Sequence, residues 1–249
     1  DVFVDTMQRD FPFQLQRAEE LRGEITIEMP EGTEVIVPIA GTEHVQELRI
    51  ERNSTPPAMA YLGKWAFSYF RLTETTRLTA TGDAPYAVGT PIRLGHSPDR
   101  KKLVLNLLVD GLSWNVARTR FPDCMPNIAR FFARGVIFDQ HFSTSECTYP
   151  ALPVIETGRY PLHTQVFNER DSHEIPLDFM TLSECMSDLG YYASAPMAAS
   201  DSVYCGALRG YDMLNVAAWK LPSAEMVDRA IMQLEAFDGT DQFLYLHTT

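Results

Sequence analysis

The sequence predicts an α/β fold, a mostly parallel sheet flanked by helices, preceded by a small all-β, sandwich-like domain. Two features of the chain predict this arrangement. Residues 1–98 contain short strand patterns separated by Gly, Pro and Asp clusters, which is typical of a β-sandwich. After Leu103, strand and helix patterns alternate, as they do in a parallel sheet with helices on both sides. We therefore expect domains at residues 1–98 and 99–249, joined near the polar linker 95–102.

In the first region, strands are expected where apolar and polar side chains alternate between turn residues. The clearest is Gly-Glu-Ile-Thr-Ile-Glu-Met at residues 23–29, followed by a turn that begins at Pro30. Residues 11–21 are expected to form a short helix before these strands. Further strands are expected at residues 34–39, 47–50, 65–72, 76–81 and 91–94.

An aromatic run lies inside one of these strands, at Trp65, Phe67, Tyr69 and Phe70. Large aromatic side chains of this kind dominate sandwich cores, and exposed ones can also form a platform for sugar rings. Both interpretations of the run stay open from the sequence alone.

In the second region, residues 103–109 form an almost continuous apolar strand, of the kind that is buried on both faces of a parallel sheet. Later strands are expected at residues 136–142, 191–195 and 243–247. Helical spacing of apolar residues predicts helices at 125–134 and 181–189. A third helix is expected to begin at Ser223, whose hydroxyl suits an N-cap.

Composition limits the classes of partner. The formal net charge of −12 argues against nucleic acid and anionic membranes, because phosphate groups are bound through Lys and Arg. No apolar run approaches the roughly 18 residues of a membrane-spanning helix. The four cysteines show no Cys-x-x-Cys spacing and are expected to be buried free thiols.

Asp110 ends the predicted strand at residues 103–109 and is followed by Gly111. Ligands of open α/β sheets bind at the carboxyl ends of the strands. A carboxylate there can ligate a divalent metal ion, and the glycine lets the backbone turn away. The same pair also fits an ordinary strand-end turn, so these residues alone allow both interpretations.

A second stretch combines several informative residues. Thr148 is followed by Pro150 and, at the end of a predicted helix, by Thr-Gly-Arg-Tyr-Pro at residues 157–161. Sulfatases and related phosphodiesterases carry a nucleophile, a proline two residues later and a helix that ends in Thr-Gly-x-x-Pro. The stretch resembles this pattern, with His163 near the position of the family's His-Gly pair.

Three further segments resemble the same family in the correct order: the helix and Gly-Tyr strand at residues 182–193, Arg-Gly-Tyr-Asp at 209–212, and the strand at 242–249. The chain is therefore identified as resembling the alkaline phosphatase/sulfatase superfamily over about residues 102–249. Residues 1–98 show no such resemblance.

The resemblance implies a metal-dependent hydrolase of small anionic esters, glycan-linked esters among them. Thr148 would be the catalytic nucleophile, and Asp110 and Thr148 would share one divalent ion, Zn, Mn or Ca. A metal ion would make the Thr148 alkoxide available near neutral pH. His163 and His247 are candidate substrate-binding residues, although each also fits a purely structural histidine.

The sequence departs from the sulfatases at the nucleophile. They oxidise a Cys or Ser to formylglycine, whereas Thr148 does not undergo this reaction, and Leu152 replaces the family's arginine. Cys147 lies one residue too early. These departures favour phosphate esters or phosphodiesters, with sulfate ester hydrolysis and a non-catalytic binding protein as alternatives. Because family members take most metal ligands from a later region, we expect the displayed chain to be the N-terminal portion of a longer enzyme and inactive alone.

Overall fold

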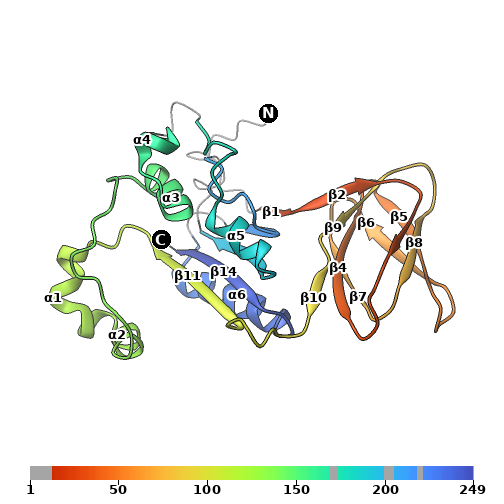
Figure 1. The fold of residues 1–249 in the computed structure, drawn as a ribbon, viewed down its shortest axis with the longest axis horizontal. Helices are drawn as coiled ribbons and strands as arrows, with labels where there is room; N and C mark the ends of the chain where they lie inside the picture. The colour runs from red at the N-terminus through yellow and green to blue at the C-terminus, as the bar shows by residue number, and fades with distance from the viewer. Residues whose placement is uncertain (1–12, 169–172, 199–204, 218–220, 249) are drawn as a thin grey trace.

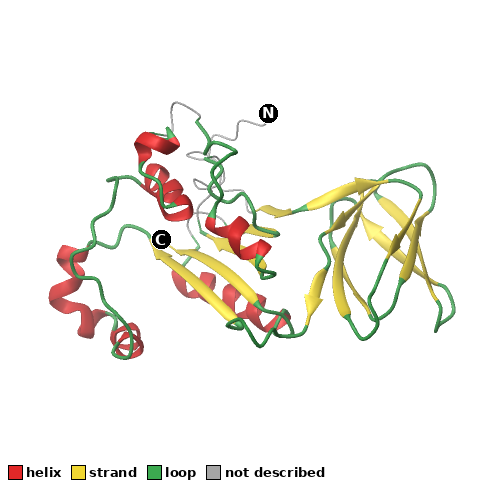
Figure 2. Ribbon diagram, in the orientation of Figure 1, coloured by secondary structure: helices red, strands yellow, loops and turns green. Residues whose placement is uncertain are grey.

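The computed structural model describes residues 13–168, 173–198, 205–217 and 221–248. These residues form an antiparallel β-rich part and an α/β part, which lie side by side along the long axis of the molecule (Figure 1). Within the described residues, every helix belongs to the α/β part (Figure 2). The predicted fold class is therefore confirmed.

The β-rich part consists of two antiparallel sheets that share one core. The first contains, in order, β10 (Ile92–Leu94), β4 (Glu34–Gly41), β9 (Tyr86–Gly89) and β2 (Ala18–Leu21), and β7 (Ser68–Leu72) also pairs with β4. The second contains, in order, β3 (Glu24–Ile27), β8 (Thr76–Ala80), β5 (Val45–Arg52) and β6 (Ala58–Gly63). Ile39, Leu48 and Leu78 are fully buried between the sheets. Because each such side chain contributes about 1.5–3 kcal/mol, the alternating pattern stabilises this part.

The prediction of a helix at residues 11–21 is wrong for residues 13–21, which the structure describes. Residues 13–21 form two strands, β1 (Phe13–Gln16) and β2. β1 pairs with a strand of the α/β part and β2 pairs with β9. β1 and β2 supply hydrogen-bond partners to backbone groups at the free edges of two sheets. These partners are distant in the sequence, so a local pattern does not reveal the pairing. Residues 11 and 12 of the expected helix lie outside the described residues.

The α/β part is built on one five-stranded sheet. Its order is β1, β13 (Met213–Val216), β12 (Tyr192–Met197), β14 (Gln242–Thr248) and β11 (Leu103–Val109). The neighbours from β13 to β11 are parallel, and β1 is antiparallel to β13. The division of the chain at residue 98 stays a prediction, and β1 shows that a segment before it contributes a strand to this sheet.

Helices cover both faces of this sheet (Figure 1). On β14, Phe243 and Tyr245 face the core beneath α3 and α5, whereas Leu244 and Leu246 pack with α6. The two helices α1 and α2 lie beyond β11 at the left of Figure 1. The helices are α1 (Trp114–Cys124), α2 (Pro126–Phe132), α3 (Thr148–Thr157), α4 (Pro161–Thr164), α5 (Leu182–Asp188) and α6 (Ser223–Ala236).

The strand at residues 103–109 is buried on one face and not on both. As β11 it pairs with β14 at the edge of the sheet. Leu103, Leu105 and Leu107 are 42%, 48% and 42% exposed, whereas Val104 and Leu108 pack against the core. An apolar run has the same sequence whether one face or two are covered, so the expectation of full burial was wrong.

Two local expectations in the α/β part are also wrong. Residues 136–142 form a loop instead of a strand, and Val136 and Phe142 are exposed. Strands need a pairing partner, which these residues lack among the described segments. Ser223 is the first residue of α6 and not its N-cap, which is Pro222.

A buried carboxylate ties the linker between the two parts to the α/β sheet. Asp241, directly before β14, is fully buried. It accepts hydrogen bonds from the backbone N–H of Ser97 at 3.0 Å and from Nε of Arg100 at 2.9 Å. The Nδ1 atom of His96 lies 2.9 Å from its other oxygen. We call this group of four residues the linker clamp.

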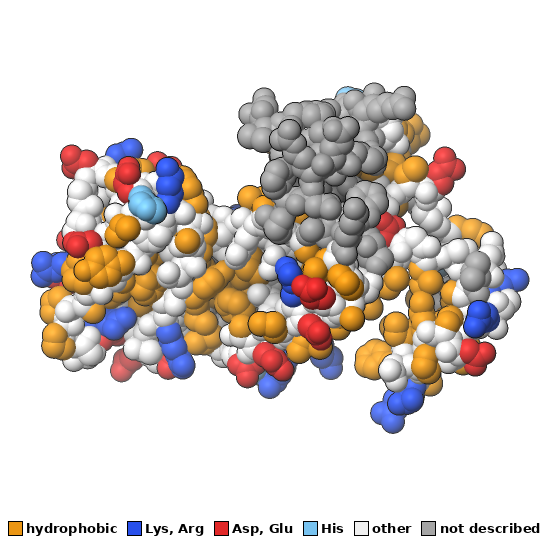
Figure 3. All heavy atoms as spheres, turned by 180° about the vertical axis from the view of Figure 1, so that it is seen from behind, with side chains coloured by type: hydrophobic (Ala, Val, Ile, Leu, Met, Phe, Trp, Pro, Cys, Tyr) orange, Lys and Arg blue, Asp and Glu red, His pale blue; other side chains and the backbone are white. Residues whose placement is uncertain are grey.

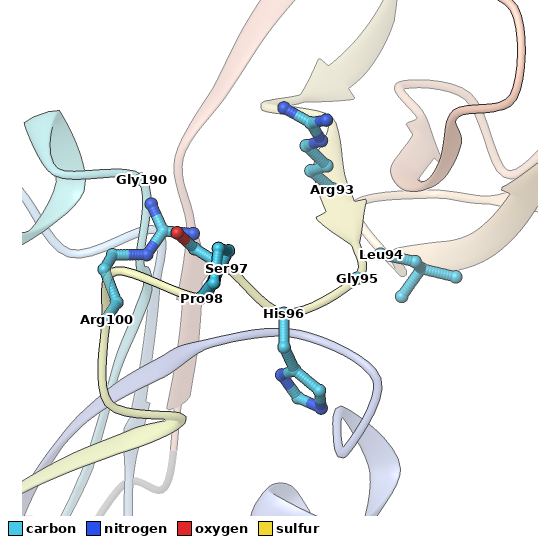
Figure 4. A pocket seen from close by; sticks show the side chains of 8 residues that line it. All are labelled: Arg93, Leu94, Gly95, His96, Ser97, Pro98, Arg100 and Gly190. Atoms are coloured by element: carbon cyan, nitrogen blue, oxygen red, sulfur yellow. The ribbon is translucent and has the colours of Figure 1, made fainter.

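A cavity of about 290 Å³ lies beside the linker clamp (Figure 4). Arg93 and Arg100 point to one side of the linker, and His96 points to the other. Gly190 completes the wall, with a φ of +87°, and a Cβ there would lie 2.5 Å from Nη1 of Arg100. Arg100 and His96 line this cavity and are already bound to Asp241. We therefore interpret these two side chains as structural parts of the cavity wall.

Candidate active site

Asp110 is held at the carboxyl end of β11 by its own backbone. Its N–H donates to the carbonyl of Thr248 at 2.8 Å, which extends the pairing of β11 with β14 by one residue. Gly111 then turns the chain with a φ of +69°, a backbone conformation that residues other than glycine rarely adopt. The N–H of Gly111 donates to Oδ1 of Asp110 at 2.8 Å. The carboxylate is therefore fixed at the sheet edge where parallel strands present their ligands.

Thr148 is the first residue of α3 and meets this carboxylate. Its Oγ1 donates to both Oδ1 and Oδ2 of Asp110, each at 3.0 Å, although 38 positions separate the two residues. The neighbouring Cys147 is the N-cap and makes no side-chain capping bond. The first backbone N–H groups of a helix have no intrahelical acceptor, so this end of α3 can face an anion. The structure thus brings together the two residues that the sequence singled out first.

His247 adjoins the same carboxylate, and His163 does not. The His247 ring is fully buried on β14, with Nε2 3.5 Å from Oδ2 of Asp110 and the Tyr245 ring centroid 6.1 Å away. His163 is exposed on the short helix α4. Within the described residues, no hydrogen bond or ion pair joins the His163 side chain to Asp110 or Thr148.

The oxygen atoms of Asp110 and Thr148 fit part of a divalent metal site. Hard cations such as Ca²⁺ bind carboxylate oxygens, and Zn²⁺ also accepts them. The side chain of Asp110 is 33% exposed, so its oxygens are accessible. No group of three or more His, Cys, Asp or Glu side chains in the described part of the chain could hold an ion. Asp110 and Thr148 by themselves would offer two oxygen donors, fewer than the three or more protein ligands that a catalytic ion needs.

The expectation of buried cysteines holds for only one of the four. Cys205 is buried and Cys185 is partly buried, whereas Cys124 and Cys147 are exposed, and no disulfide joins any of the four within the described residues. Exposure of Cys147 follows from its place at the start of α3, where the Thr148 side chain turns toward Asp110 instead. The sequence pattern carried no information on which of these two neighbouring side chains would face solvent.

A buried carboxyl at the other end of α3 was missed by sequence reasoning. Glu156 lies on the last turn of α3 and is only 3% exposed. It accepts hydrogen bonds from the N–H and hydroxyl of Ser183 on α5, each at 3.3 Å, and from the Tyr211 hydroxyl at 3.3 Å. Burial raises the pKa of the Glu156 carboxyl to about 7, although these hydrogen bonds lower it in part. A glutamate on a helix normally predicts an exposed side chain, so no local signal marked it.

Glu156→Gln is expected to remove a pH dependence of folding stability. Because the folded-state pKa is about 7 and the ordinary value is 4.5, the stabilising contribution is complete below pH 4.5. It is lost as the pH rises through about 7, and the loss is on the order of 3 kcal/mol. Urea unfolding between pH 5 and 8.5 measures this. The variant should unfold with a flatter pH profile and be more stable than the parent at pH 8.

The matched control is Glu235→Gln, which removes an exposed carboxyl on α6. It should leave the pH profile of stability unchanged. Equal profiles for the parent protein and Glu156→Gln would contradict the assignment of a protonated carboxyl between α3 and α5.

The comparison with known families agrees with the geometry. The model of the sulfatase family matches residues 102–249, which is more than half of the chain. The chain belongs to the sulfatase family. The resemblance to the alkaline phosphatase/sulfatase superfamily is thereby confirmed over the range in which it was found. No curated protein matches this sulfatase-family chain.

Two solved structures give weaker likenesses. BT4656, in complex with its substrate D-glucosamine-2-N,6-O-disulfate, is 14% identical, with a TM-score of 0.48 over 58% of this chain and 33% of that chain. A de novo designed double-stranded β-helix is 17% identical, with a TM-score of 0.19 over 32% of this chain and 94% of that chain. The sulfatase-family chain thus spans about a third of the length of BT4656. Among its described residues, no helix has the length and apolarity to cross a membrane.

Proposed function

We propose that the protein hydrolyses or transfers a small anionic ester, with Thr148 as the nucleophile. The single observation that carries this proposal is the pair of 3.0 Å hydrogen bonds from the Thr148 hydroxyl to both oxygens of Asp110. Anions bind at helix N-termini, and ligands of open α/β sheets bind at the carboxyl ends of the strands, which supports an anionic ester beside this hydroxyl. Membership of the sulfatase family supports the same class of reaction.

Asp110 and Thr148 are proposed as two ligands of one divalent ion, Zn, Mn or Ca. When bound, such an ion lowers the pKa of a coordinated hydroxyl and neutralises charge on the ester oxygens. Asp110 would orient the Thr148 hydroxyl, and the N-terminal N–H groups of α3 would face the ester anion. His247 would support Asp110 from the buried side. The proposal requires further ligands from outside the described residues.

The identity of Thr148 favours a phosphoryl over a sulfuryl group. Thr148 carries a methyl group on the carbon that formylglycine formation would have to convert into an aldehyde, so the usual sulfatase nucleophile cannot arise there. We therefore propose phosphate esters or phosphodiesters as substrates, glycan-linked esters among them. Sulfate esters are the second candidate, because of the family to which the chain belongs. His163 is proposed only as a contact to the outer part of such a substrate, because it is exposed and apart from Thr148.

The substrate class can be tested on the full-length gene product. After treatment with a chelator, Zn²⁺, Mn²⁺ or Ca²⁺ is added back, and rates are measured with bis-p-nitrophenyl phosphate, p-nitrophenyl phosphate and p-nitrophenyl sulfate. We expect metal-dependent turnover of a phosphate ester and little turnover of the sulfate. A rate with the sulfate alone would establish the second candidate. If none of the ions binds and none of the esters reacts, the proposed ester chemistry is wrong, and a non-catalytic binding role becomes the leading alternative.

A further inference from the structure

Glu156 is a buried carboxyl on the helix that begins with Thr148, and the ester chemistry proposed for Thr148 does not use it. Figure 3 shows Asp and Glu side chains spread over the surface of the protein, where water solvates them. Glu156 is instead only 3% exposed. Within the described residues, no Lys, Arg or His side chain forms an ion pair with it. A glutamate is almost never fully buried without such a partner, so the surroundings of Glu156 must accommodate it in another way.

The hydrogen bonds around Glu156 favour a carboxyl that carries a proton. The Ser183 hydroxyl has one hydrogen atom to donate. Its oxygen lies 3.3 Å from Oε2 of Glu156 and 2.6 Å from the carbonyl oxygen of Arg209. Because the carbonyl is closer, it takes this hydrogen, and the Ser183 oxygen can accept one from a protonated Glu156. An ionised Glu156 would keep only the Ser183 N–H and the Tyr211 hydroxyl as donors.

The described groups around Glu156 add no compensating positive charge. Burial raises the pKa of Glu156, and the negative charge of Glu184 on α5 raises it further. The Nε atom of Arg209 binds Oε1 of Glu184 at 2.8 Å, so this cation is already paired. The other titratable groups are weak acids, Cys205 and Tyr211 from the segment 205–212 and Tyr245 from β14. Ionisation of Glu156 would therefore leave an unpaired charge between α3 and α5, which is costly in a buried position.

One helix connects this carboxyl to the proposed nucleophile. α3 begins at Thr148 and has Glu156 in its last turn, about 12 Å further along the helix. α3 and α5 lie side by side (Figure 1), and Glu156 joins them through Ser183. The Thr148 hydroxyl reaches each oxygen of Asp110 at 3.0 Å, which is the upper end of the range for such hydrogen bonds. A small shift of α3 would therefore break the contact between Thr148 and Asp110.

We propose that Glu156 is a positioning residue for Thr148 and a pH-dependent switch, whose ionisation moves α3 away from α5 and lowers activity. The inference rests on the function proposed for Thr148. While Glu156 is protonated, α5 holds the end of α3 and Thr148 stays on Asp110. When Glu156 ionises, water must enter between the two helices to solvate the charge, and α3 shifts. A misplacement of roughly 1 Å at reacting groups can lower a rate by about 10²-fold.

The test compares the pH profiles of the full-length protein and its variants between pH 6 and 9. kcat/KM is measured with bis-p-nitrophenyl phosphate, p-nitrophenyl phosphate or p-nitrophenyl sulfate, whichever reacts fastest. Glutamine has a donor and an acceptor, as a protonated carboxyl has, and it does not ionise. Because burial raises the pKa of Glu156 to about 7, the parent should lose activity relative to Glu156→Gln as the pH rises, by roughly tenfold at pH 8.5. At pH 6 the two proteins should agree within about twofold.

Tyr211→Phe should move this profile in a defined direction. Burial raises the pKa of Glu156, and the hydrogen bond from the Tyr211 hydroxyl lowers it in part. Its removal should therefore shift the midpoint of the activity loss to higher pH, which a purely structural role of Glu156 does not predict. Glu235→Gln, which removes an exposed carboxyl of α6, should reproduce the parent profile.

A second measurement follows α3 without relying on catalysis. Hydrogen–deuterium exchange of peptides from residues 148–157 is corrected for the intrinsic exchange rate at each pH. Exchange should be faster at pH 8.5 than at pH 6 in the parent and equal at both values in Glu156→Gln. If Thr148→Ala is as active as the parent, the function proposed for Thr148 fails, and faster exchange at pH 8.5 would still show that Glu156 moves α3.

Four results would overturn the proposal. Identical pH profiles for the parent and Glu156→Gln would exclude Glu156 as the switch, and so would equal exchange of α3 at both pH values in the parent. A midpoint that Tyr211→Phe leaves unchanged or lowers would assign the activity loss to another group. Loss of the far-UV circular dichroism signal together with the activity would show global unfolding instead of a movement of α3.

Discussion

Thr148→Ala in the full-length protein is expected to lower kcat/KM for its ester substrate by at least about 10³-fold. Removal of an attacking group leaves only binding and electrostatic stabilisation, and such losses are typically of this size or larger. The bifurcated hydrogen bond to Asp110 orients the Thr148 hydroxyl, and alanine offers no atom in its place. Initial rates with the best p-nitrophenyl ester measure the loss.

Thr148→Ser is the matched control for this substitution. Serine keeps the hydroxyl and the hydrogen bonds to Asp110 and removes only a methyl group, so the rate should stay within roughly tenfold of the parent. Circular dichroism should show the same fold in all three proteins, because Thr148 is only half-buried. An alanine variant as active as the parent would exclude Thr148 and redirect attention to the exposed thiol of Cys147.

The meeting of Asp110 and Thr148 could be foreseen, because each belongs to a pattern with a fixed structural meaning. An Asp-Gly pair after an apolar strand places a carboxylate at one sheet edge, and a nucleophile followed by Pro150 starts a helix near it. The family match supports the stretch that contains both residues. Their roles as ligand and nucleophile remain predictions.

The surroundings of the site could not be foreseen, because they depend on which segments pack together. Glu156 is buried only because α5 brings Ser183 against the end of α3. Leu105 is exposed because β11 ends the sheet, although its sequence is typical of a central strand. Trp65 appeared in an ordinary aromatic run, and only the turn after β6 turns it outward. Periodicity describes one segment at a time and does not identify the partner of that segment.

Asp241→Ala is expected to destabilise the protein by about 3 kcal/mol. The substitution would leave the Arg100 guanidinium, whose side chain is 26% exposed, without its buried carboxylate. Loss of one partner of a buried ion pair typically costs about 3–5 kcal/mol, and the low end applies because Arg100 keeps some contact with water. The Ser97 N–H would lose its acceptor as well. Urea unfolding at pH 7 measures the change.

Asp99→Ala is the control, since Asp99 lies exposed in the same linker. It should change the free energy of unfolding by less than about 0.5 kcal/mol. A similar small effect for Asp241→Ala would mean that the linker clamp adds little to the attachment of the β-rich part.

The effect of Asp241→Ala should also depend on pH in a defined direction. Burial raises the pKa of the Asp241 carboxyl, but hydrogen bonds from Ser97, His96 and Arg100 outweigh burial and hold the pKa below its usual range. A depressed folded-state pKa gives stability that is complete above the unfolded value of about 3.9 and is lost as the pH falls through the folded value. The difference in stability between the parent and Asp241→Ala should therefore shrink as the pH falls below about 4. A difference that grows toward low pH would contradict a lowered pKa of the Asp241 carboxyl.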